Sequence, residues 1–110
     1  MRLFSESKYH NRKVVIDGMT FDSVKEGSRY QELKLLEKAG EIVGLVRQQK
    51  IELVPKTNMF RAVYYIPDFT YFSKREGKTI YEDVKGCKTE VYKLKKKILY
   101  WRHGIEITET

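Results

Sequence analysis

The sequence predicts a single α/β domain in which helices flank a mixed sheet. A chain of 110 residues is long enough for one hydrophobic core and too short for a second domain. Two segments carry helical signals, and the residues between them are rich in β-branched and aromatic side chains. Alternating helical and extended segments favour a layered α/β architecture over a bundle or an all-β fold.

The chain is expected to begin with a basic arm and a small hairpin. Residues 1–13 form the arm, which is rich in lysine and arginine. After it, Asp17-Gly18 separates two short apolar stretches. This dipeptide readily takes the positive φ angles of a type I′ turn, so we expect a hairpin over residues 14–21.

The first helix is expected over residues 23–39. Ser23 followed three residues later by Glu26 matches a capping box, and Gly40 is a favourable stop. Glu26 lies on the same helical side as Tyr30 and Leu33, so this side should face the sheet.

Three strands and a second helix are expected next, followed by a final strand. The strands are predicted over residues 51–54, 62–71 and 78–85, from their β-branched and aromatic content. The second helix covers residues 88–102, and a short alternating strand follows over 105–107. Four apolar residues recur in the second helix at helical spacing and are expected to face the core: Val91, Leu94, Ile98 and Trp101.

The charge favours a polyanionic partner. The net charge of +7 and the lysine-rich second helix would suit phosphate groups, because bound lysines release condensed counterions. Such a helix is more often a solvated face, and this alternative stays open. Lys95 lies near the apolar stripe and could reach toward a catalytic site. The residues expected to contact DNA are Lys8, Arg12, Lys13, Lys88, Lys93, Lys96 and Lys97.

Cysteine and histidine usage argues against a disulfide framework or a zinc site. Cys87 is the only cysteine, and we expect it to pack in or near the core, as we do for Trp101. His10 and His103 lack the short spacing of paired ligands. No apolar run approaches the roughly 20 residues that span a bilayer. A cytoplasmic protein is expected, in the host cytoplasm if the chain is phage-encoded.

The sequence places two carboxylates opposite each other. Residues two apart on a strand share a face, so Asp83 and Lys85 should point one way and Glu82 the other. A turn centred between residues 75 and 76 sets Asp68 opposite Asp83. Like charges in such a pair are destabilising unless a cation neutralises them, and Mg²⁺ prefers oxygen ligands. We therefore expect a magnesium site here, unless Asp68 only ends a strand and Asp83 belongs to a solvated polar stripe.

Pro67-Asp68 followed by Asp83-Val84-Lys85 resembles the signature of the PD-(D/E)XK nuclease superfamily. The resemblance covers about residues 20–108 and implies a restriction-endonuclease-like core: a helix, a three-stranded meander, a second helix and a further strand. It implies Mg²⁺ or Mn²⁺ bound by Asp68, Asp83, Val84 and Glu26. It also implies that Lys85 acts in catalysis beside the bound ion. Helix capping explains Glu26 nearly as well, so its role stays open.

A narrower resemblance is carried by residues 17–23, DGMTFDS, leading into Glu26 and Tyr30, and by Asp83-Val84-Lys85-Gly86 before a lysine-rich helix. This pattern is similar to small phage-encoded nucleases, some of which are regarded as Holliday-junction resolvases. It implies an endodeoxyribonuclease selective for branched DNA that acts in phage recombination or replication as a homodimer. The sequence departs from the superfamily motif in two ways. Asp83 stands where a glutamate is commoner, and Glu82 beside it is a competing candidate for the same role. Exposed aromatic residues are candidates for the dimer surface: Tyr64, Tyr65 and Phe72.

Three other functions remain alternatives. A non-catalytic DNA-binding accessory protein would explain the basic helix and arm but not the opposed carboxylates. A nicking or restriction-type nuclease would use the same fold and residues. A phage interaction protein that recruits a host factor would need neither the acids nor the basic helix. These residues are also compatible with a junction, a flap or a nick as the substrate, with DNA or RNA, and with one or two metal ions.

Overall fold

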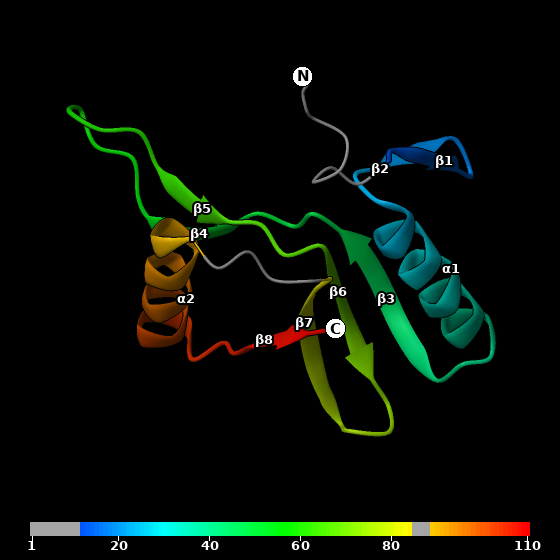
Figure 1. The fold of residues 1–110 in the computed structure, drawn as a ribbon. Helices are drawn as coiled ribbons and strands as arrows, with labels where there is room; N and C mark the ends of the chain where they lie inside the picture. Colours follow the sequence, from blue (N-terminus) through cyan, green and yellow to red (C-terminus); the bar gives the residue numbers. More distant parts are fainter. Residues whose placement is uncertain (1–11, 85–88) are drawn as a thin grey trace, which may run out of the picture.

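The computed structural model describes residues 12–84 and 89–110, and Figure 1 shows their path. The order of elements is a hairpin, a helix, five strands, a second helix and a last strand. Their bounds are β1 Val14–Ile16, β2 Met19–Phe21, α1 Val24–Lys38, β3 Ile42–Arg47, β4 Ile51–Val54, β5 Val63–Tyr65, β6 Phe69–Ser73, β7 Lys78–Asp83, α2 Glu90–His103 and β8 Ile107–Glu109.

A four-stranded mixed sheet lies at the centre, in the order β3-β6-β7-β8. β6 pairs antiparallel with β3 and with β7, whereas β8 pairs parallel with β7. The parallel pair requires a crossover, which α2 supplies between β7 and β8. The predicted α/β class with a mixed sheet and two helices is therefore confirmed. In the part of the chain that the structure describes, neither helix could cross a membrane.

The amino-terminal hairpin and α1 form as predicted. Asp17 and Gly18 have φ angles of 54° and 76°, as a type I′ turn requires. The hydroxyl of Ser23 accepts a 3.0 Å hydrogen bond from the main-chain N–H of Glu26 and caps α1. One side of α1 is buried, and it includes Tyr30 and Leu33. This side packs on Phe21 and Phe69, which fixes α1 on the sheet.

The predicted meander was wrong in its first two strands. The first strand of the central sheet is β3, which was not predicted, because a register shift between Val43 and Val46 and a positive φ at Gly44 interrupt its alternation. The predicted strand over 62–71 is two strands, β5 and β6, separated by residues 66–68. β4 and β5 form their own hairpin outside the central sheet.

The described residues form two hydrophobic cores. The first joins α1, the β1–β2 hairpin and the central strands. The second is smaller and is built on the fully buried Leu99 of α2, with Leu53 of β4 and Tyr65 of β5. Figure 1 shows α1 and α2 on opposite sides of the sheet, with the β4–β5 hairpin against α2. β6 and β7 therefore end close to the boundary between the cores.

The predicted core stripe of α2 is confirmed for Ile98 and was wrong for Val91, Leu94 and Trp101. The helix packs through Leu99, with Tyr92 and Ile98 beside it. Leu94 is 57% exposed and Trp101 is 82% exposed, so Trp101 is not a core residue. The reason is the narrow surface of the two-stranded β4–β5 hairpin, which covers only one side of the helix. The last strand also lies two residues later than predicted, at Ile107–Glu109.

Candidate active site

The structure brings Asp68 and Asp83 together at the open end of β6 and β7. The last pair of the ladder is Phe69 opposite Glu82, so the next positions are Asp68 and Asp83. The main-chain N–H of Asp68 donates to Oδ1 of Asp83 over 3.0 Å. The N–H of Val84 donates to Oδ2 of Asp68 over 2.8 Å. This is the register that the sequence predicts, and each carboxylate is held by a backbone amide of the opposite chain segment.

Asp83 is also held by the second core. Its Oδ2 accepts a hydrogen bond from the hydroxyl of Tyr65. Tyr65 is 4% exposed, so its assignment to an exposed dimer surface was wrong. It is buried because it ends β5 with its ring packed toward α2, near Tyr92. No sequence signal marked Tyr65 as a partner of Asp83, since the contact depends on how the β4–β5 hairpin meets the central sheet.

The environment of Asp68 opposes its ionisation. Burial raises its pKa, and the charges of Glu26, Asp83 and Asp22 raise it further, although the hydrogen bond from Val84 lowers it. The resulting pKa is about 7, against an ordinary value of 3.8. Several acidic groups therefore act on this one carboxyl. A cation near Asp68 would favour the ionised form.

Glu26 is buried on the sheet-facing side of α1, with 5% of its surface exposed. Burial and the nearby charge of Asp22 raise its pKa, and Arg47 opposes the rise. The Nη2 atom of Arg47 lies 3.7 Å from Oε2 of Glu26. Within the described residues, this oxygen is buried and accepts no hydrogen bond. Glu26 thus offers an oxygen with unused acceptor capacity.

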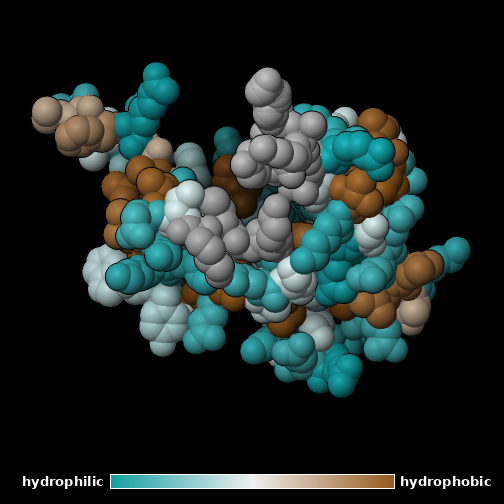
Figure 2. All heavy atoms as spheres, viewed as in Figure 1, coloured by the Kyte–Doolittle hydropathy of each residue, from teal (hydrophilic) through white to brown (hydrophobic). Residues whose placement is uncertain are grey.

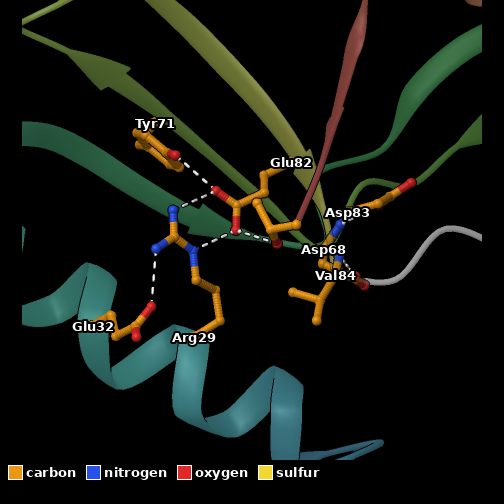
Figure 3. A network of polar contacts seen from close by, with 8 residues as sticks. Arg29, Glu32, Asp68, Tyr71, Glu82, Asp83 and Val84 are labelled. Atoms are coloured by element: carbon orange, nitrogen blue, oxygen red, sulfur yellow. Dashed lines mark hydrogen bonds and ion pairs between the residues drawn. The ribbon is translucent and has the colours of Figure 1, made fainter.

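Glu82 has a different environment on the opposite side of β7, shown in Figure 3. Its carboxylate accepts hydrogen bonds from Nε and Nη2 of Arg29, over 2.6 and 3.0 Å. The hydroxyl of Tyr71 donates to it over 2.7 Å. Glu82 is fully buried and is neutralised by Arg29 of α1. These contacts give Glu82 a structural role and leave Asp83 as the acid beside Asp68.

The residues fit a divalent cation in chemistry, but they do not form a complete ligand set. Carboxylate oxygens are the ligands that Mg²⁺ prefers, and Asp68 and Glu26 both supply them. Asp83 already accepts two hydrogen bonds within the protein. Val84 could contribute only its main-chain carbonyl, since its side chain is aliphatic. In residues 12–84 and 89–110, no group of three acidic, histidine or cysteine side chains is arranged to hold a metal.

A surface groove of about 290 Å³ leads to Asp83. Tyr64, Tyr65 and Ile66 line one side, and α2 forms the other with Tyr92 and Lys95 among its lining residues. Lys95 thus lies on the approach to Asp83, as its helical position suggested. A larger hollow of about 670 Å³ lies between the first hairpin and α1, and its lining includes none of these acids.

The other predicted residues are more dispersed. Lys85 lies outside the described residues, as do Cys87, Lys88 and Lys8. Arg12 and Lys13 are exposed, and Lys13 lies 3.2 Å from Asp22. On α2, Lys93 pairs with Glu90 and Lys96 pairs with Glu109. Figure 1 shows that the first hairpin, which follows Arg12 and Lys13, and α2 lie on opposite sides of the sheet, so these two residues do not form one patch with the lysines of α2.

The fold and these acids define a small α/β protein with a mixed central sheet, two helices and paired aspartates at the ends of adjacent strands. The family model described as "Protein of unknown function (DUF1064)" matches residues 6–108, and the chain belongs to this family. Comparison with the curated proteins and with the solved structures gives no match.

Proposed function

We propose that this protein is a Mg²⁺- or Mn²⁺-dependent endonuclease that hydrolyses phosphodiester bonds in branched DNA. The observation that carries the proposal is the pairing of Asp68 with Asp83 at the ends of β6 and β7, where burial and the charges of Glu26, Asp83 and Asp22 raise the pKa of Asp68 to about 7. Such perturbed groups cluster at functional sites. A structural polar stripe would gain nothing from carboxylates that hinder one another's ionisation.

The order of elements supports a restriction-endonuclease-like core for this proposal. α1 is followed by the meander β3-β6-β7, by α2 and by β8, which is the order that the superfamily resemblance implies. Asp68 immediately precedes the second strand of the meander, and Asp83 ends the third. The β4–β5 hairpin is an insertion between the first two strands of the meander. It lies beside α2 and does not interrupt the central sheet.

Each acid has a distinct role in the proposed site. Asp68 and Glu26 would hold the cation, together with Asp83 and the main-chain carbonyl of Val84. When bound, the cation would lower the pKa of a water molecule and withdraw charge from the scissile phosphate. Lys85 would orient the attacking water and stabilise the negative charge that develops on the phosphate. Tyr65 would hold the carboxylate of Asp83 in place.

The proposal is tested by cleavage of a labelled four-way junction and a labelled linear duplex with Mg²⁺. We expect the wild type to cut the junction, and Asp83→Asn and Lys85→Ala each to reduce the rate by at least about 100-fold. Glu76→Gln is the matched control, because Glu76 is exposed in the turn at the other end of β6 and β7. Cleavage by Lys85→Ala at the wild-type rate would refute its assigned role.

A non-catalytic DNA-binding protein is the second candidate, and the hydrogen bonds of Asp83 favour it. Both oxygens of this carboxylate already accept hydrogen bonds from the protein, so it could be purely structural. This function predicts junction binding that is unaffected by Asp68→Asn and by removal of Mg²⁺. DNA binding without cleavage of any nucleic acid, and without Mg²⁺ binding in calorimetry, would decide for it.

A junction resolvase of this size would also need two active sites, one for each of two equivalent strands. We therefore propose a twofold homodimer. Sedimentation equilibrium with and without the junction tests this part separately. A monomer bound to the junction, with a single cut per binding event, would contradict the dimer and leave the nuclease proposal intact.

A further inference from the structure

The outer side of α2 carries an exposed apolar and aromatic stripe. Val91 is 62% exposed, Leu94 57% and Trp101 82%. Together with Lys93 and Lys97 we call this surface the α2 stripe. Figure 2 shows brown apolar side chains next to teal polar ones on the side of the molecule where α2 and β5 lie. Tryptophan is rarely left this open to solvent in a folded domain.

The rotation of α2 is fixed by contacts near its carboxyl end, so Trp101 cannot turn inward. Nη1 of Arg102 donates to the main-chain carbonyl of Leu53 over 2.8 Å. The ring of His103 lies 2.7 Å from the carbonyl of Glu52. Leu99 is fully buried in a cluster with Leu53 of β4 and Tyr65 of β5. The stripe therefore faces away from the second core as a consequence of how the helix is attached.

The charges beside the stripe are positive. Lys93 and Lys97 are exposed along its edge. Lys93 is 3.4 Å from Glu90, and in the described part of the chain no carboxylate lies within ion-pair distance of Lys97. An exposed aromatic ring beside lysines suits a single-stranded nucleic acid, because a base stacks on the ring while phosphates contact the amines. An acidic or purely apolar protein partner would match only one half of this surface.

The α2 stripe is continuous with the candidate active site. Val91, at its beginning, lines the groove that contains Asp83, and Lys95 of the same helix lines it too. Trp101 lies ten residues further along, about 15 Å at the rise of an α-helix. A strand that leaves the groove would therefore pass along the stripe to Trp101.

We propose that the α2 stripe binds unpaired nucleotides of the substrate and that Trp101 stacks on one of their bases. This inference rests on the proposed nuclease function and adds to it a preference for branched DNA that has unpaired nucleotides beside the cleavage site. Lys93 and Lys97 would contact the backbone of this segment. Duplex DNA would engage the lysines without offering a free base face.

The chain contains a single tryptophan, so its own fluorescence reports on this stripe. The experiment titrates the Asp83→Asn protein, in EDTA and low salt, with oligothymidylate and with a duplex of equal length. We expect oligothymidylate to quench the fluorescence and the duplex to quench it far less. Because neither cleavage nor metal is needed, the result is independent of whether the protein is a nuclease. No quenching by oligothymidylate, or equal quenching by duplex, would overturn the inference.

A second measurement uses the anisotropy of a labelled oligothymidylate. We expect Trp101→Leu to weaken binding roughly tenfold or more, given the usual contribution of base stacking on an aromatic ring. Phe72→Leu, at an exposed aromatic residue of β6, should bind as the wild type does. Equal affinity of Trp101→Leu and the wild type would refute the role of Trp101.

Two other occupants would give distinct results, and either would overturn the inference. If the α2 stripe joins two copies of this chain, Trp101→Leu would abolish self-association in sedimentation while leaving oligothymidylate binding unchanged. If it meets a membrane, vesicles with anionic headgroups would shift the tryptophan emission to the blue and oligothymidylate would not quench it.

Discussion

The main-chain amide of Asp68 donates a 3.0 Å hydrogen bond to the carboxylate of Asp83, across the end of the β6–β7 ladder. A second amide, that of Val84, donates in the same way to Asp68. At this position the acceptors are side-chain carboxylates instead of strand carbonyls. The two acids are therefore brought together by the backbone, before any ligand binds. Amide donors favour the ionised carboxylate, but for Asp68 burial and neighbouring charge outweigh them.

The first prediction concerns pH. The pKa of Asp68 is about 7 in the folded protein, against an ordinary 3.8. Between these values the folded state keeps a proton that the unfolded state has released, so the free energy of unfolding falls as pH rises and levels off above about 7. Asp68→Asn removes this titration. We expect the Tm of the variant, relative to that of the wild type in EDTA, to rise between pH 4 and pH 7.5 by at least roughly 4 °C, the change that about 1 kcal/mol gives in a domain of this size.

Mg²⁺ provides the matched condition for that experiment. A bound cation favours the ionised form of Asp68, so Mg²⁺ should raise the Tm of the wild type above pH 6 and leave that of Asp68→Asn unchanged. Thermal unfolding followed by circular dichroism measures both effects. A pH profile of the wild type that is parallel to that of the variant would show that Asp68 titrates normally.

The second prediction separates Glu82 from Asp83. Arg29→Ala leaves the fully buried Glu82 carboxylate without its cation, which typically costs about 3–5 kcal/mol of unfolding free energy. Glu32→Gln is the control, because Glu32 contacts the same guanidinium over 3.0 Å but is largely exposed. Its cost should stay below about 1 kcal/mol. Urea unfolding measures both, and equal costs would contradict a structural role for the Arg29–Glu82 pair.

Local signals predicted the parts of the fold that depend on local chemistry. The Asp17-Gly18 turn, the Ser23 cap and the buried side of α1 all follow from residues close in sequence. The Asp68–Asp83 register also followed, because a tight turn over residues 74–77 determines which residues of β6 and β7 face each other. These features required no knowledge of distant contacts.

The features that were missed depend on long-range packing. β3 has an irregular register with β6, so its alternation is hidden in the sequence. The periodicity of residues 88–102 correctly predicted the helix α2. Apolar residues lie on several sides of this helix, however, and only its packing against β4 and β5 determines that Leu99 is buried and Trp101 is not. The same packing buries Tyr65 beside Asp83. The spacing of apolar residues in the sequence does not by itself predict which of them are buried.

The third prediction distinguishes the two roles of Glu26. The cap of α1 uses the hydroxyl of Ser23 and the main-chain N–H of residue 26, which glutamine retains. Ser23→Ala should therefore cost about 1 kcal/mol. The pKa of Glu26 is raised, which means that its environment opposes the charged form. In EDTA, the free energy of unfolding of the neutral variant Glu26→Gln should therefore equal or exceed that of the wild type.

Mg²⁺ again completes the comparison for Glu26. If its carboxylate is a ligand, Glu26→Gln should abolish the rise in Tm that Mg²⁺ gives the wild type, whereas Ser23→Ala should keep it. Should Glu26→Gln destabilise the protein in EDTA as much as Ser23→Ala does, the carboxylate itself would be a capping group and not a ligand.

The fourth prediction concerns the lysines of α2 and is tested by the salt dependence of DNA binding. The slope of log K against log salt for duplex DNA changes by about 0.9 for each phosphate that a protein neutralises. Lys93→Gln with Lys97→Gln should therefore reduce the magnitude of the slope by nearly 2. Lys96→Gln should change it less, since its amine is 3.3 Å from the partly buried Glu109, whereas Glu90, which is 3.4 Å from Lys93, is almost fully exposed. Lys74→Gln with Lys78→Gln removes the same charge at the distant β6–β7 turn and should leave the slope unchanged. If both double variants reduce it equally, the protein binds DNA through its net charge, and α2 is a solvated face.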